Sequence, residues 1–478
     1  MKHEPVPDRR RRSLSHVGGD TEVAGDVAEA QALAHALDVA PSSDDDDDPA
    51  RDHVHGFHSY PARMHPITAA RLVESFCKPG GRVFDPFCGS GTVLVEAMLQ
   101  GRRAVGGDLN PLAVLLAKRK TAPRAEAEVE HLVMQAVECA EFADARRKAK
   151  AGASHRFPPE DMELFEPHVL LELDSLRLAV FNRTHDPAFA DLQLVLSSIL
   201  VKLSKKRGDT SAAGITAVKR TAAGFPAKFF ARKAEELARR LTTFTLRLPK
   251  PVPEVLIALA DATSPTPSPG LVDAVITSPP YAATYDYSAQ HALRLRWLGM
   301  EAAGFVKGEI GSRAAYKRVS ADEARVAWCL ELGRFLNTAA LVLPIGNPLV
   351  MVVADSAVWG TALRADEIVA EVSRKHGFAP VARASQPRPH FHGPTMKAFQ
   401  DRPRHEHAIL LRREEASYRP PVPPRAKATP LPRQAPPPRV GPVPRPATPP
   451  VKREATPSAR PVRPKGIPIE RPRRKPGK

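Results

Sequence analysis

The fold of this 478-residue chain is decided by the stretch Val83-Phe84-Asp85-Pro86-Phe87-Cys88-Gly89-Ser90-Gly91-Thr92. Residues 82–85 have the apolar and aromatic side chains of a buried strand, and residues 91–100 have the pattern of a helix. Glycines in a turn between a strand and a helix allow the backbone to approach a ligand closely. This stretch therefore predicts the first strand–turn–helix unit of an α/β domain, with a ligand bound at the turn.

Strand and helix patterns continue to alternate along much of the chain. Six further strands are predicted at residues 104–108, 255–261, 273–277, 349–354, 378–385 and 406–411. Such alternation is typical of an α/β domain with a parallel sheet. The predicted fold is a doubly wound, seven-stranded, Rossmann-like sheet that ends in a closing pair of strands.

Composition divides the chain into four parts. Residues 51–120 and 254–415 form the predicted α/β domain, and residues 121–253 form a mostly helical insertion that is too long for an ordinary crossover. Residues 1–50 contain a basic run, a short helical pattern and a block of aspartates, and are predicted to be mostly disordered. Residues 416–478, rich in proline, arginine and lysine, are predicted to be a disordered tail.

The basic charge is concentrated in two segments. Of the net charge of +17, +14 belongs to residues 419–478, which contain 16 Lys and Arg against two Glu. Residues 202–240, in the insertion, contain eleven Lys and Arg against three acidic residues. Because the rest of the folded part is near neutral, this local excess predicts a nucleic-acid-binding region. Its candidate contacts are Lys205, Lys206, Arg207, Lys219 and Arg220.

The cysteines and histidines suggest no metal and no disulfide framework. Cys77, Cys88, Cys139 and Cys329 are scattered without paired spacing, which fits a reducing cytoplasm. The histidines at positions 53, 55, 58, 65, 390, 392, 405 and 407 match no strong metal spacing and are predicted to lie on the surface or in loops. No apolar stretch approaches the roughly 20 residues that span a bilayer, so a soluble cytoplasmic protein without membrane contact is expected.

Three ligands compete for the glycine turn. A dinucleotide site requires a third glycine where Leu94 stands, and a phosphate-binding loop requires a Gly-Lys-Ser/Thr sequence, which is absent. The third candidate is S-adenosylmethionine, whose ammonium group could meet Asp85 at the end of the first strand. Asp108 could accept hydrogen bonds from both ribose hydroxyls or cap the following helix. Asp261 could accept from the adenine amino group or form a turn.

A second motif, Ser278-Pro279-Pro280-Tyr281, follows the fourth predicted strand. Its two prolines fix the backbone and withhold N–H donors. Ser278 Oγ and the Pro279 carbonyl could then accept the two hydrogens of a base amino group. Tyr281 could stack on a base drawn out of the duplex.

Together these motifs resemble the amino-methyltransferases of DNA, the N4-cytosine and N6-adenine enzymes, and the Ser-Pro-Pro-Tyr form is similar to the cytosine-N4 version. The segment Phe57-His58-Ser59-Tyr60-Pro61-Ala62-Arg63-Met64-His65-Pro66 is similar to the one that closes over the methionine part of the cofactor in that family. Asp286-Tyr287 and Trp297-Leu298-Gly299 also resemble its continuation after the tetrad. The resemblance implies a methyltransferase sheet with two groups of site residues. The cofactor-binding group is Ser59, Tyr60, Asp85, Phe87, Gly89, Gly91, Asp108 and Asp261, and the catalytic group is Ser278, Pro279, Pro280 and Tyr281.

The implied reaction moves a methyl group from S-adenosylmethionine to an exocyclic amino group of a DNA base, with cytosine N4 preferred. Because the amino nitrogen itself attacks, no cysteine nucleophile is needed, and Cys88 is predicted to be a packed residue. DNA is the expected partner, and a partner restriction endonuclease would fit. The alternatives are N6-adenine methylation, an RNA or tRNA base amino-methyltransferase, and a catalytically silent DNA-binding regulator. The order of the motifs resembles the family class that has its target-recognition region between them, so the insertion is the candidate target-recognition region. Its position before the third strand departs from that class.

Overall fold

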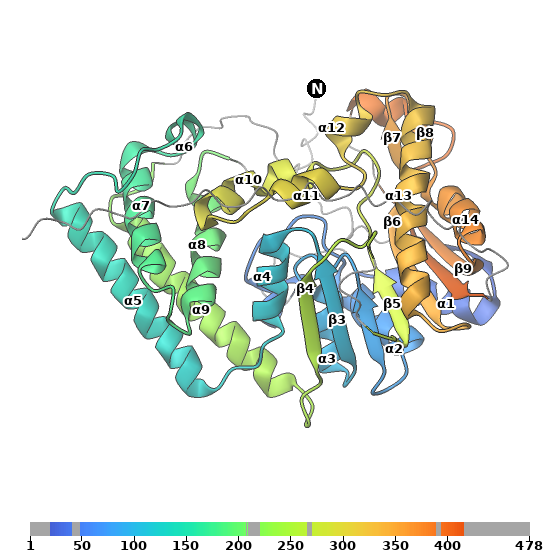
Figure 1. Ribbon diagram of the computed structural model, residues 1–478, viewed down its shortest axis with the longest axis horizontal. Coiled ribbons are helices and arrows are strands. Elements are labelled where there is room, and N and C mark those ends of the chain that lie inside the picture. The colour runs from blue at the N-terminus through green and yellow to red at the C-terminus, as the bar shows by residue number, and fades with distance from the viewer. Residues whose placement is uncertain are drawn as a thin grey trace, which may run out of the picture. The chain divides into compact units, whose positions relative to one another are not determined.

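The computed structural model describes residues 20–40, 48–206, 208, 220–264, 270–388 and 393–414. Its central sheet has eight strands in the order β1-β9-β10-β6-β5-β2-β3-β4 (Figure 1). These strands are β1 (Glu22–Gly25), β2 (Arg82–Asp85), β3 (Arg103–Asp108), β4 (Val255–Leu259), β5 (Ala274–Thr277), β6 (Pro348–Ala354), β9 (Phe378–Pro387) and β10 (His405–Arg413). A separate hairpin pairs β7 (Ser356–Val358) with β8 (Thr361–Leu363).

The predicted sheet is confirmed, and all seven predicted strands are part of it. Strands β4, β3, β2, β5 and β6 run parallel, while β10 is antiparallel to both β6 and β9. Parallel strands end at the same edge of a sheet. The residues that follow β2, β3, β4 and β5 are therefore brought to one edge, although they are far apart in the sequence.

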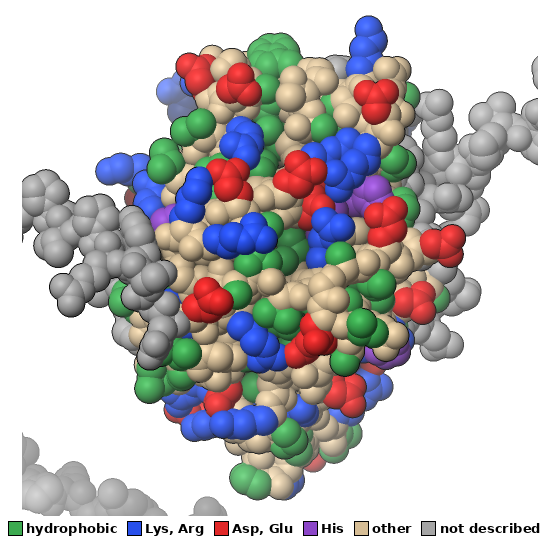
Figure 2. All heavy atoms as spheres, turned by 90° about the vertical axis from the view of Figure 1, so that its right-hand side faces the viewer, with side chains coloured by type: hydrophobic (Ala, Val, Ile, Leu, Met, Phe, Trp, Pro, Cys, Tyr) green, Lys and Arg blue, Asp and Glu red, His purple; other side chains and the backbone are tan. Residues whose placement is uncertain are grey.

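Helices cover both faces of the sheet, and the strand residues alternate between them. Val83 and Ile276 pack with helices α1, α2 and α3 on one face, whereas Phe84 and Val275 pack with α13 and α14 on the other. This alternation follows from the two-residue period of a strand. The helices are α1 (Val27–Leu37), α2 (Pro66–Phe76), α3 (Thr92–Leu99), α13 (Ala321–Val342) and α14 (Ala365–Lys375). Figure 2 shows Lys and Arg interspersed with Asp and Glu on the right-hand side of the molecule in Figure 1, the side of α13 and α14.

The short helical pattern, at residues 21–39, contains helix α1, so residues 20–40 do not share the disorder predicted for most of residues 1–50. Strand β1 pairs antiparallel with β9, and the capped helix α1 buries Leu33 and Leu37 against the sheet. Spacing of three and four residues gives α1 an apolar face large enough to offset the entropy of ordering it. Composition alone gives more weight to the charged blocks on either side than to this apolar face. Residues 1–19 and the predicted tail at 416–478 lie outside the described residues.

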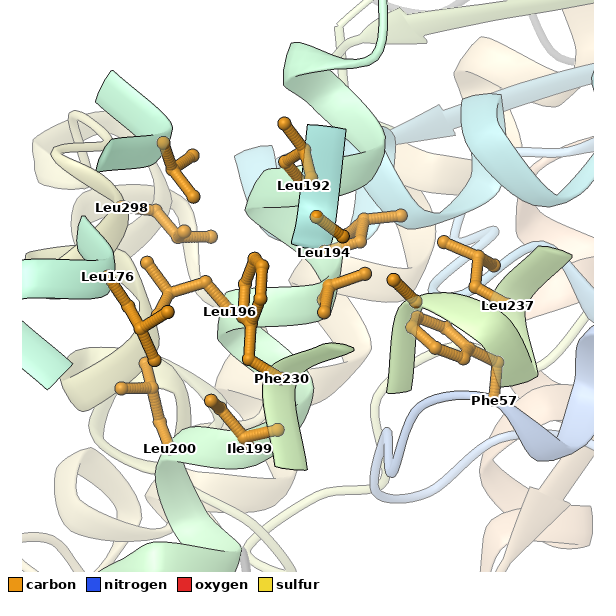
Figure 3. Packing of buried hydrophobic residues seen from close by; sticks show 14 of the residues in the cluster. Phe57, Leu176, Leu192, Leu194, Leu196, Ile199, Leu200, Phe230, Leu237 and Leu298 are labelled. Carbon is orange, nitrogen blue, oxygen red and sulfur yellow. The ribbon is translucent and has the colours of Figure 1, made fainter. Parts of the chain in front are cut away.

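The predicted helical insertion shares its core with the α/β domain. Its helices are α5 (Glu126–Lys148), α6 (Pro159–Leu164), α7 (Pro167–Phe181), α8 (Phe189–Leu203) and α9 (Phe225–Arg247). Leu112 and Leu116 of α4 (Pro111–Lys120) and Leu293 of α10 (Tyr287–Leu298) belong to the same cluster of buried side chains. Figure 3 shows Phe57, which precedes β2, beside Leu237 of α9. Both parts lie within one compact unit, residues 1–419.

Short elements complete the described chain. They are α11 (Ala303–Gly308), α12 (Arg313–Tyr316) and the 3-10 helices η1 (Pro49–Arg51), η2 (His53–Gly56) and η3 (Gly393–Phe399). No helix in the part of the chain that the structure describes is both long and apolar enough to cross a membrane.

The turn between β2 and α3 depends on glycine at position 91. Gly91 has φ +84°, and a Cβ atom there would lie 3.0 Å from Ala117 Cα of α4. Both the backbone conformation and the close approach of α4 therefore exclude a side chain. The glycine allows α3 to begin directly against its neighbour.

Gly91→Ala should lower the free energy of unfolding by about 1 to 3 kcal/mol, because it combines a strained φ with a clash against backbone. Denaturant unfolding followed by circular dichroism measures this change. Gly152→Ala is the matched control, since no atom lies within 4 Å of a Cβ built there and its φ is not positive. Equal stability of the two variants would contradict the proposed constraint.

Candidate functional site

A solvent-open cavity of about 660 Å³ lies at the edge where β2, β3, β4 and β5 end. Strand β3 lies on one side of β2 and β5 lies on the other, so the strand order reverses at this point of the sheet. Such a switch point is the usual ligand site of doubly wound sheets. Seven predicted site residues line the cavity: Tyr60, Phe87, Gly89, Asp108, Asp261, Ser278 and Pro280.

The other five predicted site residues are not among those that line the cavity. They are Ser59, Asp85, Gly91, Pro279 and Tyr281. Ser59 is exposed, and its Oγ accepts a hydrogen bond from the Arg294 guanidinium at 3.1 Å. Gly91 packs against Ala117, so its role in this structure is to seat α3.

Asp108 connects the end of β3 to the glycine turn. Its Oδ2 accepts from the Gly89 N–H at 2.8 Å, and its Oδ1 accepts from the Asn110 N–H at 2.8 Å. The cap of α4 is Asn110, whose side chain accepts from the Leu112 N–H, so capping is not the role of Asp108. Burial raises the pKa of Asp108 to about 6. Each carboxylate oxygen keeps a lone pair for a ligand hydroxyl.

Asp85 joins the two motifs from behind the cavity wall. Its Oδ1 accepts from the Thr277 hydroxyl at 2.6 Å and from the Phe87 N–H at 3.1 Å. Only 4% of Asp85 is exposed, and this burial raises the pKa of its carboxyl group to about 7. Its predicted contact with the cofactor ammonium group stays a prediction.

Asp261 has both of the features that the sequence left open. Its Oδ1 accepts from the N–H and the hydroxyl of Thr263, each at 2.8 Å, so it forms a turn. It also lines the cavity just beyond the end of β4. Contact with the adenine amino group stays a prediction.

Tyr60 lies against the glycine turn, as expected for the segment before β2. A Cβ atom on Gly89 would lie 3.3 Å from Tyr60 Cε1, so the ring sits directly over the turn. The ring stacks on His291 with centroids 4.7 Å apart, and its hydroxyl accepts from Asn110 at 3.2 Å. These contacts hold the ring in one place beside the cavity.

The tetrad places Ser278 at the cavity and Tyr281 behind it. The Ser278 hydroxyl donates to the Tyr281 hydroxyl at 3.4 Å, and the Tyr281 hydroxyl donates to Glu406 Oε1 at 3.0 Å. The aromatic rings that line the cavity are instead those of Tyr60, Phe87, Tyr287 and Phe305. Stacking of Tyr281 on a base stays a prediction.

The sequence reasoning did not assign several cavity-lining residues. They are Ala62, Pro86, Leu109, Ala260, Ala262, Tyr287, Phe305, Gly308, Glu309 and Ile310. Helix α11 lies close to the residue that follows β3, since a Cβ atom on Gly308 would lie 2.6 Å from Leu109 Cδ1. Glu309 accepts from the Ser288 hydroxyl at 2.7 Å. Among these residues Ala62, Pro86 and Tyr287 stand in motifs that carried the resemblance, but the sequence assigns them no role of their own.

Of the six described histidines, His58 and His65 lie in loops, as predicted, but none lies on the surface, and His53, His55, His405 and His407 belong to η2 or β10. These six residues, His53, His55, His58, His65, His405 and His407, are all buried. Packing of α9 and of neighbouring strands covers them, which local sequence does not reveal. Donor atoms lie within 4.8 Å of one another in two groups, His53–His55–Glu96 and Asp355–Asp366–His407. Cys88 is 4% exposed, as expected for a packed residue.

Three of the five predicted nucleic-acid contacts lie in the described part of the insertion. Lys205, Lys206 and Arg220 flank the α8–α9 connection, and Arg207 and Lys219 lie outside the described residues.

An aromatic pair lies at the start of α9, the helix that follows this connection. The rings of Phe225 and Phe229 stack with centroids 5.4 Å apart. Arg232 lies over Phe225 at 5.5 Å, and Lys202 lies over Phe229 at 5.8 Å. We call Lys202, Lys205, Phe225, Phe229 and Arg232 the basic–aromatic surface.

Comparisons with known proteins match the segment that contains the glycine turn. Residues 38–119 match the family model described as DNA methylase. The Type II methyltransferase M.MvaI of Kocuria varians is 42% identical over 73 residues, which are 15% of this chain and 16% of that protein. The tRNA (guanine(10)-N2)-dimethyltransferase of Methanothermobacter thermautotrophicus is 47% identical over 62 residues, 13% of this chain and 18% of that protein.

The chain is related to the N4/N6 DNA methylases. The resemblance predicted from the motifs is thus confirmed, and so is S-adenosylmethionine as the cofactor. The match spans less than a fifth of the length of both relatives. Among solved structures, the rRNA methyltransferase aviRa from Streptomyces viridochromogenes overlaps 79% of this chain and 95% of its own, with 14% identity and a TM-score of 0.30.

The side chains that line the cavity suit the charge of the cofactor. The carboxyl groups of Asp108, Asp261 and Glu309 line it, which suits a ligand that carries a sulfonium and an ammonium group. The missing side chain of Gly89 leaves room for the Tyr60 ring beside the cavity.

Asp85→Asn should make the cofactor-free protein more stable at pH 8, by about 1 to 4 kcal/mol. The folded-state pKa of about 7 lies above the ordinary 3.8, so the contribution of Asp85 to wild-type stability declines as the pH rises from 4 to 7. The Asn amide oxygen can still accept both hydrogen bonds without becoming charged. Urea unfolding at pH 5, 6, 7 and 8 measures the gain, which should shrink toward pH 5. A variant less stable than the wild type at pH 8 would contradict this.

Proposed function

We propose that this protein transfers a methyl group from S-adenosylmethionine to an exocyclic amino group of a DNA base, with cytosine N4 preferred. One observation carries the proposal: Ser278 and Pro280 of the tetrad line the same cavity as Gly89 and Asp108 of the cofactor site. The cofactor and the target are thus given adjoining positions. The Ser-Pro-Pro-Tyr form supports cytosine over adenine.

The tetrad residues would position the target rather than react with it. When bound, S-adenosylmethionine supplies a methyl group that the amino nitrogen takes up, and that nitrogen loses one proton. Ser278 Oγ and the Pro279 carbonyl are hydrogen-bond acceptors, matching the two hydrogens of a base amino group. Pro279 and Pro280 have no N–H to compete for these acceptors. Asp108 would hold the ribose hydroxyls of the cofactor.

Nucleic acid would dock on the basic–aromatic surface. Helix α9 runs toward the start of β4, so its N-terminal end lies on the same side of the molecule as the end of β4 and the cavity (Figure 1). Cationic side chains neutralise phosphates, and aromatic rings stack on unpaired bases. On the side of α13 and α14, by contrast, the positive side chains alternate with negative ones (Figure 2). The pairs Arg325–Glu371 and Lys375–Glu371 are examples.

A base in RNA is the second candidate target. The relative named as a tRNA (guanine(10)-N2)-dimethyltransferase favours it. Adenine N6 in DNA is the alternative within the leading proposal. A partner restriction endonuclease stays a prediction.

Ser278→Ala should slow methyl transfer about tenfold or more and leave cofactor affinity within about twofold, because it removes one acceptor for the target. Asp108→Ala should instead weaken cofactor binding about tenfold or more, since it also frees the Gly89 turn. Methyl-labelled cofactor is incubated with genomic DNA or with total RNA, and the modified nucleoside is identified by mass spectrometry. Calorimetry gives the cofactor affinity.

The outcomes of that assay separate the candidates. Label found only in RNA would contradict the DNA target, and N6-methyladenine would contradict the preference for cytosine. Full activity of Ser278→Ala would contradict the role given to the tetrad.

The double variant Lys205→Glu/Arg232→Glu should bind DNA about tenfold more weakly at 0.1 M salt and show a shallower salt dependence, because fewer counterions are released. Fluorescence anisotropy over a series of salt concentrations measures both quantities. Arg103→Glu is the control, since Arg103 is exposed at the start of β3, at the opposite edge of the sheet. Equal weakening by both variants would remove the proposed surface.

A further inference from the structure

A buried ion pair lies directly behind the tetrad. Glu406 of β10 is 6% exposed and Arg388, just after β9, is 5% exposed. The Arg388 Nε and Nη2 atoms both lie 3.0 Å from Glu406 Oε2. The other oxygen of Glu406, Oε1, accepts from the Tyr281 hydroxyl at 3.0 Å. A side chain 125 residues away in sequence therefore holds the last residue of the tetrad.

The topology of the sheet explains how Glu406 reaches this position. Strand β10 is antiparallel to β6, so it begins at the edge where the parallel strands end. Glu406 pairs with Ala354, the last residue of β6, and β6 neighbours β5, which leads into Ser278. The carboxyl group is thus delivered to the cavity edge from the far side of β6.

The hydrogen bonds that link Arg388, Glu406, Tyr281 and Ser278 each have a fixed direction. A carboxylate paired with a guanidinium offers only acceptors, so the hydrogen between Glu406 and Tyr281 belongs to the phenol. The Tyr281 hydroxyl has only one hydrogen, and Glu406 accepts it. The Tyr281 oxygen can therefore only accept from Ser278, whose Oγ lies 3.4 Å away. Ser278 then has no hydrogen left for the cavity. Its remaining lone pairs are what a ligand meets.

We propose that Glu406 is a positioning residue that, through Tyr281, makes Ser278 a pure hydrogen-bond acceptor. The inference rests on the proposed function, because it concerns how the tetrad selects its target. An acceptor at Ser278 favours a group with N–H, such as a base amino group, and disfavours a carbonyl oxygen. As the amino nitrogen becomes positively charged during methylation, its hydrogen bond to Ser278 strengthens. The arrangement therefore stabilises the transition state more than the bound substrate.

Four variants test this chain of hydrogen bonds: Glu406→Gln, Tyr281→Phe, the double variant, and Tyr316→Phe as a matched control. Glu406→Gln keeps an acceptor for Arg388 but adds an amide donor that can reverse the direction at Tyr281. Tyr281→Phe keeps the ring and removes the hydroxyl. The control removes the hydroxyl of another buried tyrosine, which donates to Glu331 at 2.8 Å and does not line the cavity.

Each single variant should lower kcat about tenfold, while KM for DNA and the Kd for the cofactor stay within about twofold. The double variant should fall no further than Tyr281→Phe, because both changes break the same chain. Tyr316→Phe should keep the wild-type kcat. Circular dichroism melting checks that each protein folds. If Glu406→Gln does not fold, Tyr281→Phe still tests the inference.

The inference alone would be overturned by wild-type kcat in Glu406→Gln or by losses that multiply in the double variant. An equal loss in Tyr316→Phe would also overturn it, because any buried hydroxyl would then matter as much. A wild-type protein that methylates neither DNA nor RNA would contradict the proposed function itself, and the inference with it.

Discussion

The hydrogen bond from Thr277 to Asp85 joins the ends of β2 and β5, which are 192 residues apart in the sequence. Asp85 begins the glycine turn and Thr277 immediately precedes Ser278, so this bond of 2.6 Å fixes the distance between the two motifs. It exists because both strands run parallel and end at one edge of the sheet. Together with the pairing of β2 and β5, it holds the cofactor turn beside the tetrad.

That position has an energetic consequence. Asp85 and Asp108 are both removed from water, and burial raises the pKa values of both carboxyl groups. Holding them ionised at neutral pH opposes folding, because the charged forms lose hydration. Hydrogen bonds from Phe87, Gly89 and Thr277 offset part of this loss. Perturbed pKa values cluster at functional sites, which agrees with the place of Asp108 at the cavity and of Asp85 behind its wall.

The helical insertion contributes to the site through packing as well as through its surface. Lys233 of α9 lies 4.7 Å from the centre of the Phe57 ring and donates to the Phe57 carbonyl at 3.2 Å. Arg294 of α10 donates to Ser59 and to the Ser197 carbonyl of α8. The segment before β2 is therefore held between the insertion and the sheet. This arrangement explains how Tyr60 keeps its place over the glycine turn.

The sequence by itself determined the fold class, the seven strands, the cofactor turn and the tetrad. Each depends on neighbouring residues: strand and helix periods, glycines where φ is positive, and prolines that withhold donors. Composition misled for residues 20–40, because flanking charged blocks outweighed the apolar face of α1. It could not show that Asn110, rather than Asp108, caps α4.

Only the tertiary structure decided which of these residues face the ligand. It placed Gly91 and Tyr281 outside the cavity lining, and Tyr287 and Glu309 within it. It also set Glu406 behind Tyr281, since strand order brings β10 next to β6. Sequence patterns report a residue's own element, whereas strand order and helix packing decide which distant elements meet. A residue such as Glu406, which acts through contact with a distant element, therefore has no signal in its own stretch of sequence.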